Sequence, residues 1–396
     1  MGYLFVGQIV HSKSFDELEV IDNGFLAVEN GKIIAIGDAT QLPNWRKDTS
    51  KYEVIRMTKN QFILPGFIDC HIHAPQMPNI GLGLNMELLD WLKTYTFPME
   101  SQYKDSQFAA YVYAKVVAFI EGIKALNSDL ISVTITPRFA LSCDEYLMNE
   151  LGKLAKEHNL NIQTHISENL GEIAAVKEVF RAPNYASVYD SANLLTPKCI
   201  LAHGVHLEDE EIDLLKARGT SVAHCPSSNT NLQSGLCDVL RLRKAGVAVG
   251  LGTDISGGSN VSILTTIRDA LGVSHHLNFV KKQNIKGTGS VTPQNELQKK
   301  VNEEYVPMNY KQALYLATLG GAEALNLSQK IGNFEVGKEF DALLIDIDVD
   351  PIDVYTPNVE GIKDKPENLE ERIQKFIYTG DDRNISRVFV KGKPVK

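Results

Sequence analysis

Four apolar, strand-like runs in this sequence each end in a histidine or an aspartate. They span residues 65–73, 161–165, 199–203 and 249–254. Segments of helical periodicity lie between such runs, including residues 144–158 and 208–218, and this alternation is typical of βα units that build a parallel sheet. When such strands close into a barrel, their carboxyl ends meet on one face. The sequence therefore predicts an α/β barrel with polar side chains gathered at that face.

The first run ends in His71 and His73, which are two positions apart. Successive strand residues point to opposite faces, so these two imidazoles share one face. An isolated His-x-His is more often a pair of packed or solvated side chains. Here three further strands end in His165, His203 and Asp254. Imidazoles and a carboxylate converging on one barrel face predict a divalent metal site.

The region between the two chain ends contains six strand-like runs. They are residues 61–73, 130–136, 161–167, 199–203, 221–224 and 247–254. The chain ends instead contain short apolar runs separated by turn residues such as Asn30-Gly31, at 5–10, 25–29, 32–36, 53–57, 341–347 and 386–390. We therefore expect a (β/α) barrel at residues 63–332. A small β-sandwich domain would combine residues 1–62 with residues 333–396.

Composition excludes several classes of partner. Lys and Arg number 40 against 49 Asp and Glu, a net charge of −9, which argues against nucleic acid bound through its phosphates but not against a neutral purine. No apolar run approaches the roughly 20 residues that span a bilayer, so no membrane association is expected. Five cysteines, never spaced C-x-x-C, are typical of reduced thiols in a cytoplasmic protein.

These motifs resemble the amidohydrolase superfamily of metal-dependent barrels and, more closely, its guanine deaminase family. The resemblance covers nearly the whole chain through HIHAPQ (71–76), LDWLKTYTFP (89–98), TPRF (136–139), THISEN (164–169), AHCP (223–226), GTD (252–254) and GNFEVGKEFD (332–341). His-x-His and Gly-Thr-Asp indicate only the superfamily, whereas Gln76 and Arg138-Phe139 indicate the guanine branch. The resemblance implies hydrolytic deamination of guanine to xanthine and ammonia in purine catabolism, by a homodimer.

The resemblance also implies a role for each site residue. One Zn²⁺ per subunit would be held by His71, His73, His165 and Asp254. Zinc lowers the pKa of a bound water towards ~7. Asp254 would take the water proton, and His203 would orient the water and stabilise the developing charge. Glu168 would carry the proton to a ring nitrogen and help the amine to leave.

Guanine presents two adjacent acceptors, O6 and N7, which match the fork of an arginine guanidinium. The resemblance assigns this contact to Arg138, an amide contact to Gln76 and coverage of the ring face to Phe139. Relatives with two metal ions place a carboxylated lysine at a strand end. The run ending at residues 136–138 and the next run offer no lysine. One zinc is therefore expected, with iron as the alternative because these ligands discriminate weakly between metals.

The interval from His73 to Thr136 is unusual. It is long enough for two strand–helix units, yet it contains no strand-like run, and residues 108–126 have helical periodicity. The family places two strands here, so we expect this barrel to lack two strand–helix units, a loss of about sixty residues after Val117. Such a loss would affect the whole barrel, because the number of strands and the closure of a barrel are linked.

Two other functions stay open at this point. A shortened chain could be an inactive isoform that serves as an interaction subunit. Another amidohydrolase could act on a related heterocycle, although Gln76 and Arg138-Phe139 favour guanine. Metal content and ammonia release from guanine separate the enzyme from the inactive subunit.

Overall fold

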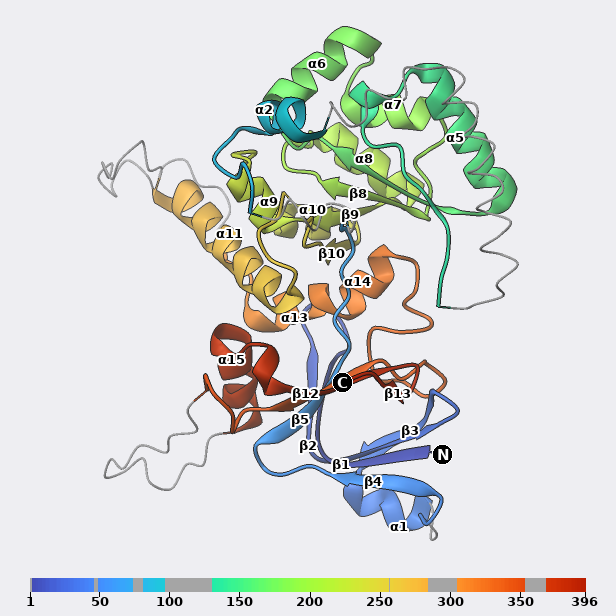
Figure 1. The fold of residues 1–396 in the computed structure, drawn as a ribbon, viewed down its shortest axis with the longest axis vertical. Helices are drawn as coiled ribbons and strands as arrows, with labels where there is room; N and C mark the ends of the chain where they lie inside the picture. The colour runs from blue at the N-terminus through green and yellow to red at the C-terminus, as the bar shows by residue number, and fades with distance from the viewer. Residues whose placement is uncertain are drawn as a thin grey trace. The chain divides into compact units, whose positions relative to one another are not determined.

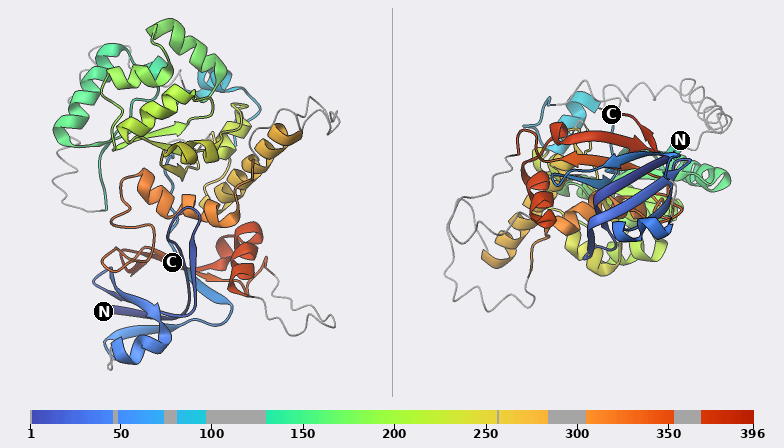
Figure 2. Two further views of the ribbon diagram at one scale, coloured as in Figure 1. Left: turned by 180° about the vertical axis from the view of Figure 1, so that it is seen from behind. Right: turned by 90° about the horizontal axis from the view of Figure 1, so that it is seen from below.

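The computed structural model describes residues 2–45, 49–73, 81–96, 130–255, 257–283, 305–352 and 368–396. It comprises two compact units, one formed by Met1–Asp69 with Ser262–Lys396 and the other by Cys70–Val261 (Figures 1 and 2). The domain limits at residues 62 and 332 stay a prediction. Among the described residues, no helix combines the length and the apolar character needed to cross a membrane.

The first unit contains a mixed eight-stranded sheet in the order β13-β12-β11-β5-β1-β2-β3, with β4 paired to β1. The strands are β1 (Gly2–Ser12), β2 (Leu18–Glu29), β3 (Lys32–Asp38), β4 (Tyr52–Arg56), β5 (Gln61–Pro65), β11 (Ala342–Asp346), β12 (Ile385–Val390) and β13 (Lys393–Pro394). They confirm the strand runs predicted at both chain ends. A β-sandwich domain remains a prediction.

Local sequence explains this sheet. Asn30 and Gly31 have φ values of 52° and 79°, the left-handed conformation that a tight β2–β3 turn needs. The core packs Phe5 against Phe340 and Phe389, with ring centroids 5.1 and 5.4 Å apart. The helices in the described residues of this unit are α1 (Leu42–Trp45), α11 (Ile263–Gln283), α13 (Tyr310–Ala317), α14 (Leu319–Ala324), α15 (Leu369–Thr379) and the 3₁₀ turns η1 (Ala39–Gln41) and η6 (Asp382–Asn384).

The second unit contains a parallel sheet in the order β10-β9-β8-β7-β6. Its strands are β6 (Thr134–Ile135), β7 (Asn161–Ile166), β8 (Cys199–His203), β9 (Ser221–His224) and β10 (Val249–Leu251). Every residue of β8, β9 and β10 is buried, which explains why they are continuous apolar runs in the sequence. In the described part of the chain, β6 ends this sheet.

Helices alternate with these strands, as predicted (Figure 1). They are α2 (Leu88–Trp91), the π-helical turn η3 (Leu92–Thr96), the 3₁₀ turn η5 (Ala140–Ser142), α5 (Glu145–His158), α6 (Leu170–Phe180), α7 (Tyr185–Ser191), α8 (Asp209–Arg218), α9 (Pro226–Asn231) and α10 (Val239–Ala245). The predicted helices at 144–158 and 208–218 are confirmed as α5 and α8. Asp144 caps α5 by accepting a hydrogen bond from the backbone N–H of Leu147. The helical prediction for 108–126 lies outside the described residues.

The prediction of one continuous strand over residues 61–73 is wrong. The strand β5 ends at Pro65 and belongs to the sheet of the first unit. Pro65 has no N–H to donate and Gly66 is flexible, so the chain can leave one sheet at this point. The following segment runs beside β10 in the second unit, where Cys70 N donates to Leu251 O at 2.8 Å and Asp254 N donates to His71 O at 2.8 Å. This pairing brings His71 to the ends of the parallel strands.

Candidate active site

Four side-chain atoms that could hold a metal ion converge at the carboxyl ends of the strands. The Nε2 atom of His165 lies 3.2 Å from the Nε2 atoms of both His71 and His73. Asp254 Oδ1 lies 3.3 Å from the same two nitrogens. Tetrahedral zinc with ligands at about 2.0–2.2 Å separates its donor atoms by roughly 3.3–3.6 Å. Three imidazoles and one carboxylate at this spacing fit one zinc ion.

His165 is held with its metal-binding nitrogen turned towards this cluster. Its Nδ1 atom lies 2.5 Å from the carbonyl oxygen of Arg138, which can only accept, so Nδ1 carries the proton and Nε2 carries a lone pair. The hydroxyl of Tyr189 donates to the carbonyl of His165 at 2.7 Å. The end of β7 is therefore fixed on both its backbone and its side chain.

The protonation states of these groups suit metal binding. Burial lowers the pKa of His71 and, together with the neighbouring imidazoles, lowers the pKa of His165 well below its ordinary value. Burial alone would raise the pKa of Asp254, but hydrogen bonds with His71 and His73 outweigh it and hold that pKa well below its ordinary range. His71 and His165 therefore present neutral imidazoles and Asp254 presents an ionised carboxylate, the forms that bind metals.

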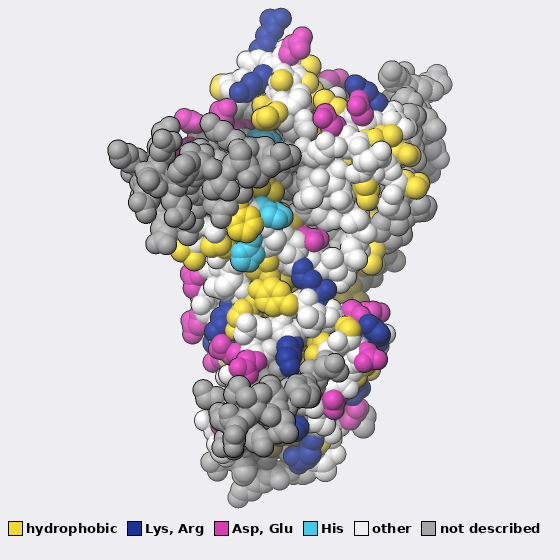
Figure 3. Space-filling model, turned by 90° about the vertical axis from the view of Figure 1, so that its left-hand side faces the viewer, with side chains coloured by type: hydrophobic (Ala, Val, Ile, Leu, Met, Phe, Trp, Pro, Cys, Tyr) yellow, Lys and Arg dark blue, Asp and Glu magenta, His cyan; other side chains and the backbone are white. Residues whose placement is uncertain are grey.

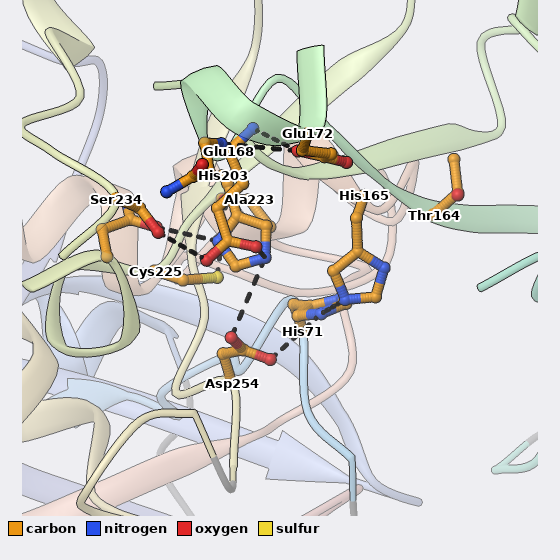
Figure 4. Close-up of polar contacts among 12 residues, drawn as sticks. His71, Thr164, His165, Glu168, Glu172, His203, Ala223, Cys225, Ser234 and Asp254 are labelled. Carbon is orange, nitrogen blue, oxygen red and sulfur yellow. Dashed lines mark hydrogen bonds and ion pairs between the residues drawn. The ribbon is translucent and has the colours of Figure 1, made fainter. Parts of the chain in front are cut away.

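His203 and Glu168 lie beside the cluster (Figure 4). The Nε2 atom of His203 is 3.4 Å from Glu168 Oε2 and 3.8 Å from Asp254 Oδ2. Burial would lower the pKa of His203, but the charges of Glu168 and Asp254 raise it. Burial also raises the pKa of Glu168. Buried groups with shifted pKa values beside a candidate metal site have the chemistry of proton-transfer residues.

Three residues at the strand ends have left-handed backbone conformations. They are Ser167, His203 and Asp254, with φ values of 48°, 76° and 47°. Such conformations cost roughly 1–3 kcal/mol for a residue with a side chain and persist where the surroundings enforce them. The backbone is therefore bent at the positions from which the site side chains project.

The sequence-predicted substrate residues lie partly within the described chain. Arg138 and Phe139 line the same pocket as His73, Glu168 and Asp254. One part of the pocket wall is apolar and contains Leu88, Trp91, Leu92 and Leu232, which pack with Phe139. Gln76 lies outside the described residues. The structure thus brings two of the three predicted substrate residues to the candidate metal site.

Sequence reasoning missed three buried polar residues around this site. The hydroxyl of Ser234 donates to Glu168 Oε1 at 2.9 Å (Figure 4). Asn229 Oδ1 lies 2.8 Å from His203 Nδ1. Glu172 accepts a hydrogen bond from the backbone N–H of Glu168 at 3.1 Å, and burial and the charge of Glu168 raise its pKa to about 7. The Asn-Leu-Gly-Glu pattern at 169–172 is a capping-box signature that marks Glu172 in the sequence.

A second possible set of metal-binding atoms overlaps the first. His203, Cys225 and Asp254 offer atoms within 4.8 Å of one another. The carboxylate of Asp254 belongs to both sets, so this second set depends on the geometry of the first. Cys225 is fully buried, and its Sγ atom packs close to Gly252.

The buried side chain of His224 is expected to make the stability of the folded protein depend on pH. It is fully buried at the end of β9, and neither ring nitrogen has a hydrogen-bond partner among the described residues. Burial lowers its pKa to about 3, so between pH 6.5 and pH 3 the unfolded chain binds a proton that the folded chain does not. Stability conferred by the neutral ring is therefore lost as pH falls, by up to roughly 4 kcal/mol.

Substitution of His224 by leucine is expected to flatten this pH dependence. The measurement is urea denaturation at a series of pH values, followed by tryptophan fluorescence. Wild type and His224→Leu both carry Trp45→Phe, so that the fluorescence comes from Trp91 alone. The two curves at each pH give the difference in free energy of unfolding. The matched control is His276→Leu, because His276 is exposed. A difference between wild type and His224→Leu that stays constant from pH 7 to pH 4 would contradict the prediction.

The chain is similar to known amidohydrolases over most of its length. A model of the Amidohydrolase family matches residues 109–395. Guanine deaminase of Rattus norvegicus is 37% identical over 465 aligned positions, more than the 396 residues of this chain, and the match covers 100% of this chain and 97% of the rat protein. A solved guanine deaminase from C. acetobutylicum, with bound guanine in the active site, has a TM-score of 0.78 and 29% identity, with all of both chains covered. A zinc-bound adenosine deaminase from Xanthomonas campestris (TM-score 0.73, 20% identity, 99% and 92% coverage) shares the fold.

Proposed function

The chain belongs to the guanine deaminase family of amidohydrolases and has the amidohydrolase fold, and we propose that it hydrolyses guanine to xanthine and ammonia. Water adds to the ring carbon that carries the exocyclic amine, the carbon–nitrogen bond breaks and ammonia leaves. The observation that supports this proposal is that the predicted substrate-binding residues and the predicted catalytic residues line one pocket. Arg138 and Phe139 line it together with the metal-binding His73 and the acid–base residue Glu168.

A single zinc ion per subunit is the cofactor that the donor set supports. Three imidazole nitrogens and a carboxylate oxygen, from His71, His73, His165 and Asp254, have the spacing of a tetrahedral site. When bound, zinc supplies a water of lowered pKa and Lewis-acid polarisation. Iron suits the same ligands, so the metal content of the purified protein decides between the two ions.

Three residues would move protons at this site. Asp254, ionised at neutral pH, accepts the proton of the attacking water. His203, with Nδ1 donating to Asn229, orients the attacking water through Nε2 and, once Nε2 gains a proton, stabilises negative charge as it develops at the reacting centre. Glu168 passes a proton to a ring nitrogen of the purine and then assists departure of the amine. The Nε2 atom of His203 lies 3.4 Å from the carboxylate of Glu168 and 3.8 Å from that of Asp254, so a proton would move only a short distance between these groups.

Arg138 and Phe139 would select the purine. The guanidinium of Arg138 donates to the adjacent O6 and N7 acceptors of guanine, an arrangement that adenine does not offer because its exocyclic nitrogen is a donor. Phe139 and the neighbouring Trp91 give an apolar wall for the planar ring. Gln76 would add an amide contact.

Guanine turnover is the direct test of this function. Purified protein supplied with zinc is expected to release ammonia and xanthine from guanine, while adenine gives no product. Removal of the metal with a chelator should abolish turnover, and added zinc should restore it. A folded sample that holds one equivalent of zinc and does not turn over guanine would overturn the proposal in favour of an inactive interaction subunit.

Two strand–helix units would be missing from the barrel of this chain. Two observations support this. The alignment with the rat guanine deaminase has 465 positions, more than the 396 residues of this chain, and β6 lies at the end of the described parallel sheet. The missing units would lie between the segment containing His71 and strand β6. We propose that the barrel domain spans residues 63–332 and that residues 1–62 and 333–396 form the small β-sandwich domain.

A homodimer in the cytoplasm is the proposed state of the protein. The five cysteines carry thiols and not disulfides, as expected for a reducing compartment. On the face drawn in Figure 3, acidic and basic side chains of the described residues are interspersed. This mixture of charges does not favour nucleic acid bound through its phosphates.

A further inference from the structure

The imidazole of His203 is fixed from both sides. Its Nε2 atom faces two carboxylates, Glu168 at 3.4 Å and Asp254 at 3.8 Å. Its Nδ1 atom lies 2.8 Å from the amide oxygen of Asn229. His203 and Asn229 are each 1% exposed, so water does not compete for this contact.

The amide oxygen of Asn229 can only accept a hydrogen bond, so His203 donates from Nδ1. With Nδ1 committed to Asn229, the nitrogen left for chemistry is Nε2, which points at the acid–base carboxylates. A histidine without this partner could rotate about its side-chain torsions or exchange its proton between the two nitrogens.

The chain positions Asn229 by a short segment after β9. Pro226 begins α9, and the backbone N–H of Asn229 donates to Cys225 O at 3.0 Å, which places residue 229 on the first turn. The carbonyl of Asn229 in turn accepts from the backbone N–H of Ser234 at 2.8 Å. Ser234 donates to Glu168, so one segment contacts both proton-transfer residues.

We infer that Asn229 is a positioning residue for guanine deamination: it holds Nδ1 of His203 protonated and aims Nε2 at the reacting centre. This inference rests on the proposed function. Asn229 itself is absent from the residues that line the pocket, and it acts through His203.

Replacement of Asn229 by leucine removes the acceptor and keeps the number and branching of the heavy side-chain atoms. Because misplacement of a proton-transfer group by about 1 Å can cost 10²-fold, kcat is expected to fall about 10²-fold. KM for guanine and zinc content should stay within about two-fold of wild type. Asn229→Asp restores an acceptor and should recover kcat to within about ten-fold. Asn231→Leu is the matched control, because Asn231 lies on the same helix and bonds Ser227 and Gly257 instead of His203.

A second readout does not depend on turnover. The ¹⁵N spectrum of the zinc-loaded protein, with the His203 signal assigned by its absence in His203→Gln, should show a protonated Nδ1 in wild type and exchange between tautomers in Asn229→Leu. If Asn229→Leu does not fold, Asn229→Ala is read in the same way.

The possible failures are distinguishable. Wild type that does not turn over guanine, yet shows protonated Nδ1 of His203 only when Asn229 is present, overturns the proposed function and leaves the role of Asn229 in setting the tautomer standing. Wild type that turns over guanine, with unchanged kcat and unchanged ¹⁵N signals in Asn229→Leu, overturns the inference alone. Parallel loss of kcat and zinc in Asn229→Leu would mean a structural role and would also overturn it.

Discussion

Replacement of Asp254 by asparagine is expected to lower kcat for guanine by at least about 10³-fold, because the amide cannot accept the proton of the attacking water. The same carboxylate contributes Oδ1 to the metal-binding cluster, 3.3 Å from the Nε2 atoms of His71 and His73. Zinc affinity should therefore fall as well, and kcat is measured at saturating zinc.

The control for this substitution is Asp213→Asn, since Asp213 is an exposed aspartate on α8, and it should leave both kcat and zinc affinity unchanged. Turnover by Asp254→Asn within about ten-fold of wild type at saturating zinc would show that Asp254 is not the base. Loss of turnover that is restored completely by more zinc would assign Asp254 to metal binding alone.

Substitution of Glu168 by glutamine is the second large effect and separates proton transfer from metal binding. The amide has the shape of the carboxylate and can still accept from Ser234, which donates to Oε1 at 2.9 Å, but it cannot carry a proton. Loss of a positioned acid–base group costs typically 10²–10⁴-fold, so kcat should fall within that range. Zinc content should stay at the wild-type value, because Glu168 is outside the group of four donors.

Stability provides an internal check on Glu168→Gln. Burial raises the pKa of Glu168, so at neutral pH ionisation of this carboxyl works against folding. Its removal is expected to leave the free energy of unfolding unchanged or higher, while activity falls. Glu178→Gln, an exposed position on α6, is the matched control. A fall in kcat that accompanies equal loss of stability would indicate a structural role instead.

The strand ends that form the site could be predicted from the sequence, because a buried strand is a run of apolar residues and the polar residue that enters the site ends that run. Strands β8 and β9 are buried on both faces, so they are apolar until the residue that enters the site. His203 ends one such run. The exact extent of β5 could not be predicted, because a proline–glycine pair within an apolar run can continue a strand or end it. Which occurs depends on the neighbouring strand, here β11.

Asn229 and Ser234 could not be identified in the same way. They reach His203 and Glu168 from the α9 segment and the loop after it, where no periodicity reveals which side chains point inwards. Their contacts depend on the folded path of the backbone, such as the bond from Ser234 N to Asn229 O at 2.8 Å. Seryl and asparaginyl side chains are common in loops for reasons of local turn geometry, so their presence alone carries no functional signal.

The pairing of the His71 segment with β10 has a consequence for the abundance of the folded protein in a cell. Residues 71 and 254 are joined by a backbone hydrogen bond of 2.8 Å, and closing a loop of about 180 residues is slow and entropically costly. An ion held between His71 and Asp254 would tie the same two segments a second time. We therefore expect loss of zinc to lower the abundance of the folded protein as well as its activity, because chains in which these two segments separate are degraded.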